Sequence, residues 1–167
     1  MREPKTLFEA AEDGDLEWIT NVVERTLEYD INQQDKLQRT ALHWAAELGH
    51  AEVVKKLLGY GCNPLIPDYS GRLPLHLASR SLHLPVLKLL IEGLDKEQAV
   101  AMANSTDNMG ITPLFLALQR GPDVSKDVFE YLMHNGATYN TGMKLKSTVL
   151  QKGEASISAV QVGGMDT

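Results

Sequence analysis

The strongest constraint in this sequence is an internal repeat with a period of 33 residues. Residues 39–58, RTALHWAAELGHAEVVKKLL, align with residues 72–91, RLPLHLASRSLHLPVLKLLI, and nine of the 24 aligned positions from Asp35 onward are identical. Chance would give roughly one or two identities, so the period is a property of the chain. Such a chain folds as a row of similar units, each of which buries its apolar face against its neighbour.

Two further copies flank this pair, with irregular spacing. The last of the four copies begins at Asp107, which is 39 residues after Asp68, and a degenerate first copy begins near Thr6. The extra residues fall in 93–102, where they add a helical turn, extend the preceding helix or form a loop for a specific contact. Another insertion near 122–126 delays the last helix. We therefore expect one repeat domain over residues 1–140, divided into a cap at 6–34 and repeats at 35–67, 68–106 and 107–140.

Each copy is predicted to fold into two short helices. In the second copy, small apolar side chains recur at helical spacing from Leu42 to Ala46, and branched ones recur from Val53 to Leu58. Gly49 lies between the two stripes and can adopt the left-handed conformation that ends the first helix. Neither helix could bury its stripe alone, so the stack of units must supply the core.

Composition and charge argue against several function classes. The 16 basic and 22 acidic residues give a net charge of −6, the opposite of the field that attracts nucleic acids. A single cysteine, Cys62, excludes an internal disulfide and is too little for a structural zinc site. The sequence has no run of 18 apolar residues and no apolar signal segment at its start. We therefore expect no membrane insertion and a cytoplasmic or nuclear location.

The charge is unevenly distributed along the chain. Residues 1–34 carry three basic and nine acidic side chains, whereas the charges of residues 35–167 sum to zero. This acidic end is either a solvated region that keeps the molecule soluble or a surface that steers a basic partner.

The repeated residues resemble the ankyrin-repeat family. The resemblance is carried by residues 35–58 with Gly61, by Asp68, Gly71 and residues 74–78, and by Asp107, Gly110, residues 112–114, Gly136, Ala137 and Asn140. It implies an all-α solenoid of stacked helix-turn-helix units with projecting β-hairpin-like loops and a concave binding face. It also implies a non-catalytic scaffold or adaptor that binds a protein or peptide.

Four positions depart from the ankyrin pattern. Gln38 and Leu82 stand in place of glycines, Leu73 replaces the capping threonine, and Phe115 replaces the motif histidine. Because glycine adopts left-handed backbone without strain, the turn at Leu82 must differ from the pattern or be strained. Pro85 is expected in the first turn of the following helix, where proline is tolerated.

We find no catalytic, metal or cofactor site in this sequence. The resemblance implies that His43 and His76 are structural and bind the backbone of a neighbouring unit. His43 and His50 are seven residues apart, which does not match the i, i+4 pair of a helical zinc site. Cys62 is expected to be a small buried residue. We therefore predict that the protein is not an enzyme.

The resemblance also implies which residues contact a partner, namely those around the motif turn and just after the alanine pair of the first helix. In this chain they are Lys36, Leu37, Arg39, Glu47, Tyr69, Ser70, Arg72, Arg80, Asn108, Met109, Ile111 and Gln119, with Glu12 in the cap. The arginines suggest a partner that is acidic at the contact; the alternative is that Arg39 and Arg72 pair with acids of adjacent units. Leu37, Met109 and Ile111 are expected to be exposed, which a covering partner would explain.

Residues 141–167 contain no aromatic residue and no repeat motif. We expect them to be mostly disordered, or to form one short helix through Leu145, Val149 and Leu150 that covers the last unit. The alternation in residues 156–162 is that of a short strand.

Three functions can be weighed from these features. The first, and our prediction, is a protein-binding module without chemistry of its own. The second is a regulatory or targeting segment of a larger enzyme or channel assembly, such as a truncated form. The third is nucleic-acid binding through the arginines, which the net charge disfavours and which predicts steep salt dependence.

Overall fold

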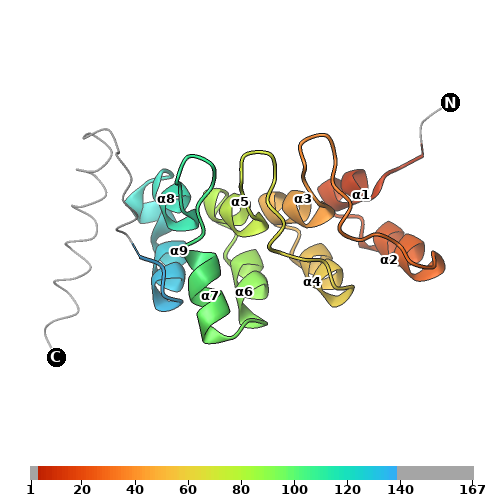
Figure 1. Cartoon of the computed structure of the whole chain (residues 1–167). Helices are drawn as coiled ribbons and strands as arrows, with labels where there is room; N and C mark the ends of the chain where they lie inside the picture. The colour runs from red at the N-terminus through yellow and green to blue at the C-terminus, as the bar shows by residue number, and fades with distance from the viewer. Residues whose placement is uncertain (1–3, 139–167) are drawn as a thin grey trace, which may run out of the picture.

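The computed structural model describes residues 4–138, and every regular element in that range is an α-helix (Figure 1). The helices are α1 (Leu7–Asp13), α2 (Leu16–Arg25), α3 (Ala41–Leu48), α4 (Ala51–Gly59), α5 (Pro74–Arg80), α6 (Leu84–Glu92), α7 (Lys96–Ala103), α8 (Pro113–Leu118) and α9 (Pro122–His134). All except α7 occur as pairs joined by a short turn. The all-α stack that the repeat predicts is confirmed.

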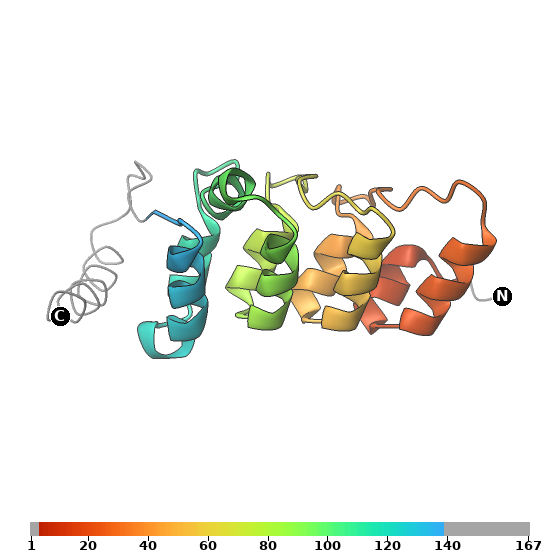
Figure 2. The ribbon, with the colours of Figure 1, turned by 90° about the horizontal axis from the view of Figure 1, so that it is seen from below.

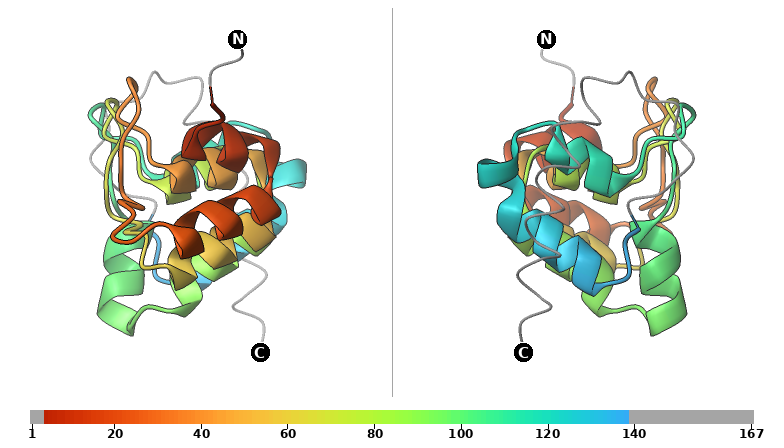
Figure 3. Two further views of the ribbon diagram at one scale, coloured as in Figure 1. Left: turned by 90° about the vertical axis from the view of Figure 1, so that its right-hand side faces the viewer. Right: turned by 90° about the vertical axis from the view of Figure 1, so that its left-hand side faces the viewer.

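The paired helices form two rows. The inner row consists of α1, α3, α5 and α8, and the outer row consists of α2, α4, α6 and α9 (Figures 1 and 2). Within the rows, α3 packs between α1 and α5, and α4 packs between α2 and α6. The long loops that lead into α3, α5 and α8 project from the same side of the stack (Figure 3).

Side-chain size explains the spacing of the rows. Ala45, Ala46 and Ala78 on the inner helices are fully buried, and their small side chains let neighbouring inner helices approach closely. Leu57 and Leu90 on the outer helices are also buried and fill the space between successive pairs. The core is therefore one continuous cluster along the stack rather than a set of separate cores.

The turns within the first three helix pairs keep one geometry despite their different residues. Gly49 ends α3 with φ +77°, and a Cβ there would lie 2.6 Å from Nδ1 of His83. Leu82 occupies the equivalent turn after α5 with φ +61°, so that turn is strained rather than rebuilt. Gln38, the other replaced glycine, has φ +57°. Pro85 lies in the first turn of α6, as expected.

The insertion after α6 is a separate helix, which corrects the expectation of an added turn or a plain extension. Helix α6 ends at Glu92, and Asp95 then accepts the backbone N–H of Gln98 at 2.8 Å. A new N-cap of this kind starts an independent helix. Helix α7 consequently projects from the body of the stack (Figure 3). The second insertion lengthens α9, which begins at Pro122 and has 13 residues.

The long loops resemble β-hairpins only in their tight turns, since residues 4–138 contain no strand. No helix in this range is long and apolar enough to cross a membrane. Asn140 and the expectations for residues 141–167, including the short helix and the short strand, lie outside the described residues.

Candidate functional site

Three loops with the same geometry carry most of the predicted binding residues. They are residues 35–39, 68–72 and 107–111, and each starts with an aspartate. Its Oδ1 atom accepts the backbone N–H groups two and four residues ahead, at 2.8–3.0 Å. Its own N–H donates to the carbonyl four residues ahead, at 2.9 Å in each loop. These Asx-type turns fix the backbone of every loop tip.

Successive loops are joined by hydrogen bonds between their tips. The backbone N–H of Tyr69 donates to the carbonyl of Leu37 at 3.0 Å, and that of Asn108 donates to the carbonyl of Ser70 at 2.9 Å. The side-chain amide of Asn108 also donates to the carbonyl of Tyr69 at 3.1 Å. The three tips therefore form one connected backbone surface, which we call the loop-tip surface.

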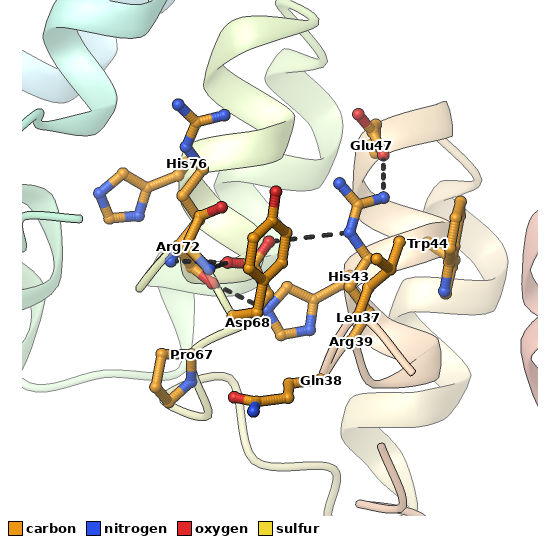
Figure 4. Close-up of polar contacts among 12 residues, drawn as sticks. Leu37, Gln38, Arg39, His43, Trp44, Glu47, Pro67, Asp68, Arg72 and His76 are labelled. Atoms are coloured by element: carbon orange, nitrogen blue, oxygen red, sulfur yellow. Dashed lines mark hydrogen bonds and ion pairs between the residues drawn. The ribbon is translucent and has the colours of Figure 1, made fainter. Parts of the chain in front are cut away.

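His43 supports the loop-tip surface from below. Its Nδ1 atom accepts the N–H of Thr40 at 3.0 Å, which leaves Nε2 to donate to the carbonyl of Arg72 in the next loop at 2.9 Å (Figure 4). Burial lowers the pKa of His43, so the ring is neutral at pH 7 and suited to this pair of bonds.

His76 repeats the arrangement one loop further along. Its Nδ1 atom accepts the N–H of Leu73 at 3.1 Å, and Nε2 donates to the carbonyl of Ile111 at 3.2 Å. Burial lowers the pKa of His76 to about 4. Both histidines thus bond the backbone of the next loop, as the resemblance implied. Phe115 has no ring nitrogen, so its unit cannot make this bond.

Arg39 lies within a cluster of charged and aromatic side chains (Figure 4). Its guanidinium group is 2.6 Å from a carboxylate oxygen of Glu47 and 3.7 Å from one of Asp68 in the next loop. It also stacks over the ring of Trp44, with 4.6 Å between the guanidinium carbon and the ring centroid. Arg80 on α5 forms an ion pair with the same Glu47. The cluster links α3 to the next pair of helices.

Arg72, like Arg39, lies close to the aspartate of the next loop. Its Nε atom is 3.1 Å from the carboxylate of Asp107. The carboxylate of Asp107 is nearly inaccessible to water, so this is a largely desolvated pair. Of the two alternatives left open by the sequence, the structure shows Arg39 and Arg72 paired with acids of adjacent loops. These arginines connect the stack.

The predicted binding residues differ in exposure. Tyr69 is 63% exposed, Met109 78% and Leu37 43%. Ile111 is half-buried, which corrects the expectation that it would be exposed. Of the other predicted residues, Lys36, Asn108, Gln119 and Glu12 are exposed, and Arg39, Glu47, Ser70, Arg72 and Arg80 are half-buried.

A family model described as ankyrin repeats (3 copies) matches residues 7–100, which is more than half of the sequence. The chain belongs to the ankyrin-repeat family. Inversin from Homo sapiens is 34% identical over 99 residues, which are 59% of this chain and 9% of inversin. NF-kappa-B inhibitor alpha from Homo sapiens is 33% identical over 110 residues, which are 66% of this chain and 34% of that protein. The chain therefore spans a minor part of the length of both relatives.

Ankyrin repeats generally mediate protein–protein interaction and are typically non-catalytic. This ankyrin-repeat chain contains no group of three or more His, Cys, Asp or Glu side chains in residues 4–138 that could hold a metal ion. Cys62 is buried, and desolvation raises its pKa to about 12, so it carries no thiolate at neutral pH. Nε2 of His50 donates to the carbonyl of Glu12 at 2.8 Å and so links the first two helix pairs.

The sequence analysis missed Trp44 and Gln34 as parts of this ankyrin surface. The indole N–H of Trp44 donates to Asp35 at 2.8 Å, which fixes the first loop. The side-chain amide of Gln34 donates to the carbonyls of Gln38 and Pro67, at 2.6 and 3.3 Å. No motif position marks either residue. Trp44 is half-buried, and the sequence alone gives its indole N–H no identifiable partner.

Proposed function

We propose that this ankyrin-repeat chain is a non-catalytic binding module that holds a protein or peptide against its loop-tip surface and the adjoining inner helices. One observation carries the proposal: Leu37, Tyr69 and Met109 are exposed apolar or aromatic side chains, one on each of three loops that are bonded to one another. Exposed apolar groups on a rigid support lose little entropy when they are covered, which favours binding.

The chemistry of the surface favours a partner that offers apolar side chains to the loop tips. An acidic partner, which the arginines suggested, would compete with Glu47, Asp68 and Asp107 for the same guanidinium groups. Arg80 is the most accessible of the paired arginines, with 36% of its side chain exposed. We therefore propose apolar contacts at the tips and, as a secondary feature, an acidic group of the partner near Arg80.

The test is affinity capture with variants of the exposed tips. Replacing Tyr69 and Met109 with serine removes two of the three tip side chains and leaves every bond between the loops in place, because those bonds use the backbone, the side chain of Asn108 and the arginine–aspartate pairs. The captured protein is expected to fall by roughly tenfold or more, in line with the loss of two interface anchors. The thermal unfolding midpoint is expected to stay unchanged.

A matched control replaces Leu27 and Val124 with serine. These residues are 96% and 68% exposed and lie outside the loop tips, so the control removes comparable apolar surface elsewhere. The control is expected to retain capture. Equal retention by both double variants would refute the proposal, and a lower unfolding midpoint in the first variant would assign Tyr69 and Met109 to the scaffold instead.

A second role is favoured by the limited coverage of the relatives. Because the repeats align with only 9% of inversin and 34% of NF-kappa-B inhibitor alpha, such arrays occur as parts of longer chains. We propose as the alternative that the chain is a regulatory or targeting segment of a larger enzyme or channel assembly. An immunoblot of native tissue in which the main product is much heavier than 18.4 kDa would favour this role.

We also propose a cytoplasmic or nuclear location, since the single cysteine is a buried thiol and not half of a disulfide in the chain. Imaging of the tagged protein in cells tests this proposal. Exclusive location at a membrane or outside the cell would refute it.

A further inference from the structure

Met109 is the most accessible of the three methionines in residues 4–138. Its exposed fraction is 78%, against 39% for Met133 on α9 and 2% for Met102 on α7. Oxidation of a methionine requires that the oxidant reach the thioether sulfur, so exposure decides which of them reacts first. Cys62 carries the other sulfur atom of this range. It is buried and its pKa is raised to about 12, so it offers an oxidant no thiolate at neutral pH.

The last loop holds the backbone of Met109 in a fixed position. The N–H of Met109 donates to Oδ1 of Asp107 at 2.9 Å, and the N–H of Gly110 donates to the carbonyl of Asp107 at 2.9 Å. The Met109 side chain belongs neither to the buried cluster of the stack nor to the half-buried side chains that pack against it. A chemical change at its sulfur therefore leaves the fold and the loop backbone intact.

The three loops differ in chemistry at the position that Met109 occupies. Two residues after the aspartate, the first loop carries Leu37, the middle loop Ser70 and the last loop Met109. Leucine and serine side chains have no group that hydrogen peroxide oxidises at neutral pH. Among these three equivalent positions, Met109 alone makes the loop-tip surface sensitive to an oxidant.

We propose that Met109 is a redox modification site, at which hydrogen peroxide converts the thioether to a sulfoxide and thereby weakens partner binding. This inference rests on the proposed function, because Met109 is one of the three exposed side chains of the loop tips. In the reaction, a lone pair of the sulfur forms a bond to one peroxide oxygen, the O–O bond breaks, and the other oxygen leaves as water. Sulfur is oxidised and the peroxide is reduced, so no further reactant is needed.

The sulfoxide acts on the complex rather than on the free chain. In the free chain the new oxygen is hydrated, because the side chain is exposed. In the complex, apolar groups of the partner cover this oxygen, and a polar atom that loses water without gaining a hydrogen bond is costly. Oxidation is therefore expected to weaken binding roughly tenfold and to leave the thermal unfolding midpoint unchanged.

The modification is reversible by a known class of enzyme. Methionine sulfoxide reductases remove the oxygen as water while two thiols are oxidised to a disulfide. The exposed loop tip gives such an enzyme access to the sulfoxide. Treatment of the oxidised chain with a reductase is therefore expected to restore binding.

Peptide mapping of the full chain tests the site without any partner. The chain is treated with hydrogen peroxide for increasing times, catalase removes the excess, and mass spectrometry measures the sulfoxide at each methionine. Met109 is expected to oxidise faster than Met133 and roughly tenfold or more faster than the buried Met102, in the order of their exposure. A rate at Met109 no higher than the rate at either of the other two would overturn the proposal.

Affinity capture before and after oxidation tests the effect on binding. The readout is the amount of protein captured from a lysate by the peroxide-treated chain, divided by the amount captured by the same chain untreated. The proteins counted are those that the double serine variant of Tyr69 and Met109 fails to capture. This ratio is expected to fall roughly tenfold for the original chain and to recover after reductase treatment.

Two leucine variants locate the effect. Met109→Leu removes the sulfur, so its ratio is expected to stay near unity whatever amount it captures untreated. Met133→Leu is the matched control outside the loop tips, and its ratio is expected to fall as much as that of the original chain. An equal fall in Met109→Leu, or a lower unfolding midpoint of the oxidised chain, would overturn the proposal.

The double serine variant separates this proposal from the proposed function. If that variant loses capture but oxidation of Met109 in the original chain does not reduce it, the redox site is refuted and the loop-tip surface still binds the partner. If the double serine variant retains capture, the proposed function fails and the effect of the sulfoxide on binding fails with it.

Discussion

The α3–α4 and α5–α6 pairs have the same backbone conformation at their caps and turns, but different residues adopt it. Before α3, Thr40 is a capping residue whose hydroxyl lies 2.9 Å from His43 Nδ1, and Gly49 forms the turn without strain. Before α5 stands Leu73, which offers only its backbone N–H to His76, and Leu82 adopts the left-handed turn at φ +61°. The neighbouring units impose the geometry even where the local residues disfavour it.

Each pair contains residues that raise the energy of the folded chain. The α3–α4 pair is preceded by a strained Gln38, and the α5–α6 pair carries Leu82 and a buried serine, Ser79, whose hydroxyl has no hydrogen-bond partner. The effect of a substitution on the free energy of unfolding should therefore depend on its position within the repeat more than on which helix pair carries it. Substitutions at matched positions can measure the difference.

The largest effect is expected from the leucines that fill the outer row. Leu57→Ala and Leu90→Ala each remove a buried side chain at the same repeat position, and each is expected to lower the free energy of unfolding by about 3 kcal/mol. Urea unfolding followed by circular dichroism measures the loss. Leu65→Ala is the control, because this side chain is 56% exposed and its removal should change stability by less than about 0.5 kcal/mol. A loss below 1 kcal/mol in either buried variant would show that the two pairs are not held by neighbour packing.

The next largest effect is a loss of folding stability at low pH. His76 has a pKa of about 4 in the folded chain against 6.5 in an exposed histidine, so the unfolded chain binds a proton first as the pH falls. The stability contributed by the neutral ring is complete above pH 6.5 and declines between pH 6.5 and 4, by about 3 kcal/mol in total. Burial of His43 acts in the same direction.

His76→Gln isolates this contribution, since an amide can still donate to the Ile111 carbonyl but does not titrate. The difference in unfolding free energy between the original chain and the variant is expected to shrink as the pH falls from 6.5 to 4. A difference that stays constant across this window would mean that His76 is not the source of the acid sensitivity. Chemical unfolding at a series of pH values supplies the curves.

Much of the fold could be predicted because the repeat encodes it in local rules. The helix pairs follow from the apolar stripes, and the turn follows from Gly49, whose φ of +77° is the conformation that glycine favours. The bonds of His43 and His76 to the next loop followed from family resemblance, since spacing alone gives a histidine no partner. The loop-tip surface was predicted in the same way.

Other features depend on contacts that no local pattern reports. The insertion became α7 because Asp95 and Gln98 form a capping box, a signal that was present in the sequence but outside the repeat. Whether Arg39 meets Glu47 or a partner depends on side-chain directions across two units, which sequence spacing does not determine. The last loop is bonded to His76 through the carbonyl of Ile111, a contact between residues 35 positions apart.

A smaller effect is expected at the buried serine. Ser79 is fully buried on α5 without a partner for its hydroxyl, and its counterpart on α3 is Ala46, also fully buried. Ser79→Ala removes an unsatisfied polar group and is expected to stabilise the chain by about 1 kcal/mol. Ala46→Ser, the mirror substitution, is expected to cost at least as much. Opposite signs in thermal unfolding support the comparison, and a loss of stability in Ser79→Ala would mean that the hydroxyl makes a bond in solution.

The smallest effect is expected at the first loop tip. Gln38 has φ +57°, whereas Gly71 and Gly110 occupy the equivalent positions of the next two loops with φ +76°. The left-handed conformation costs a residue with a side chain about 1–2 kcal/mol, and part of the gain from glycine is lost to the greater freedom of the unfolded chain. Gln38→Gly is therefore expected to raise the free energy of unfolding by about 0.5 kcal/mol. Lys36→Gly in the same loop is the control, since Lys36 has no positive φ and glycine there should only destabilise. If both glycine variants lower stability equally, the strain at Gln38 is already relieved by its neighbours, and the first loop is as relaxed as the other two.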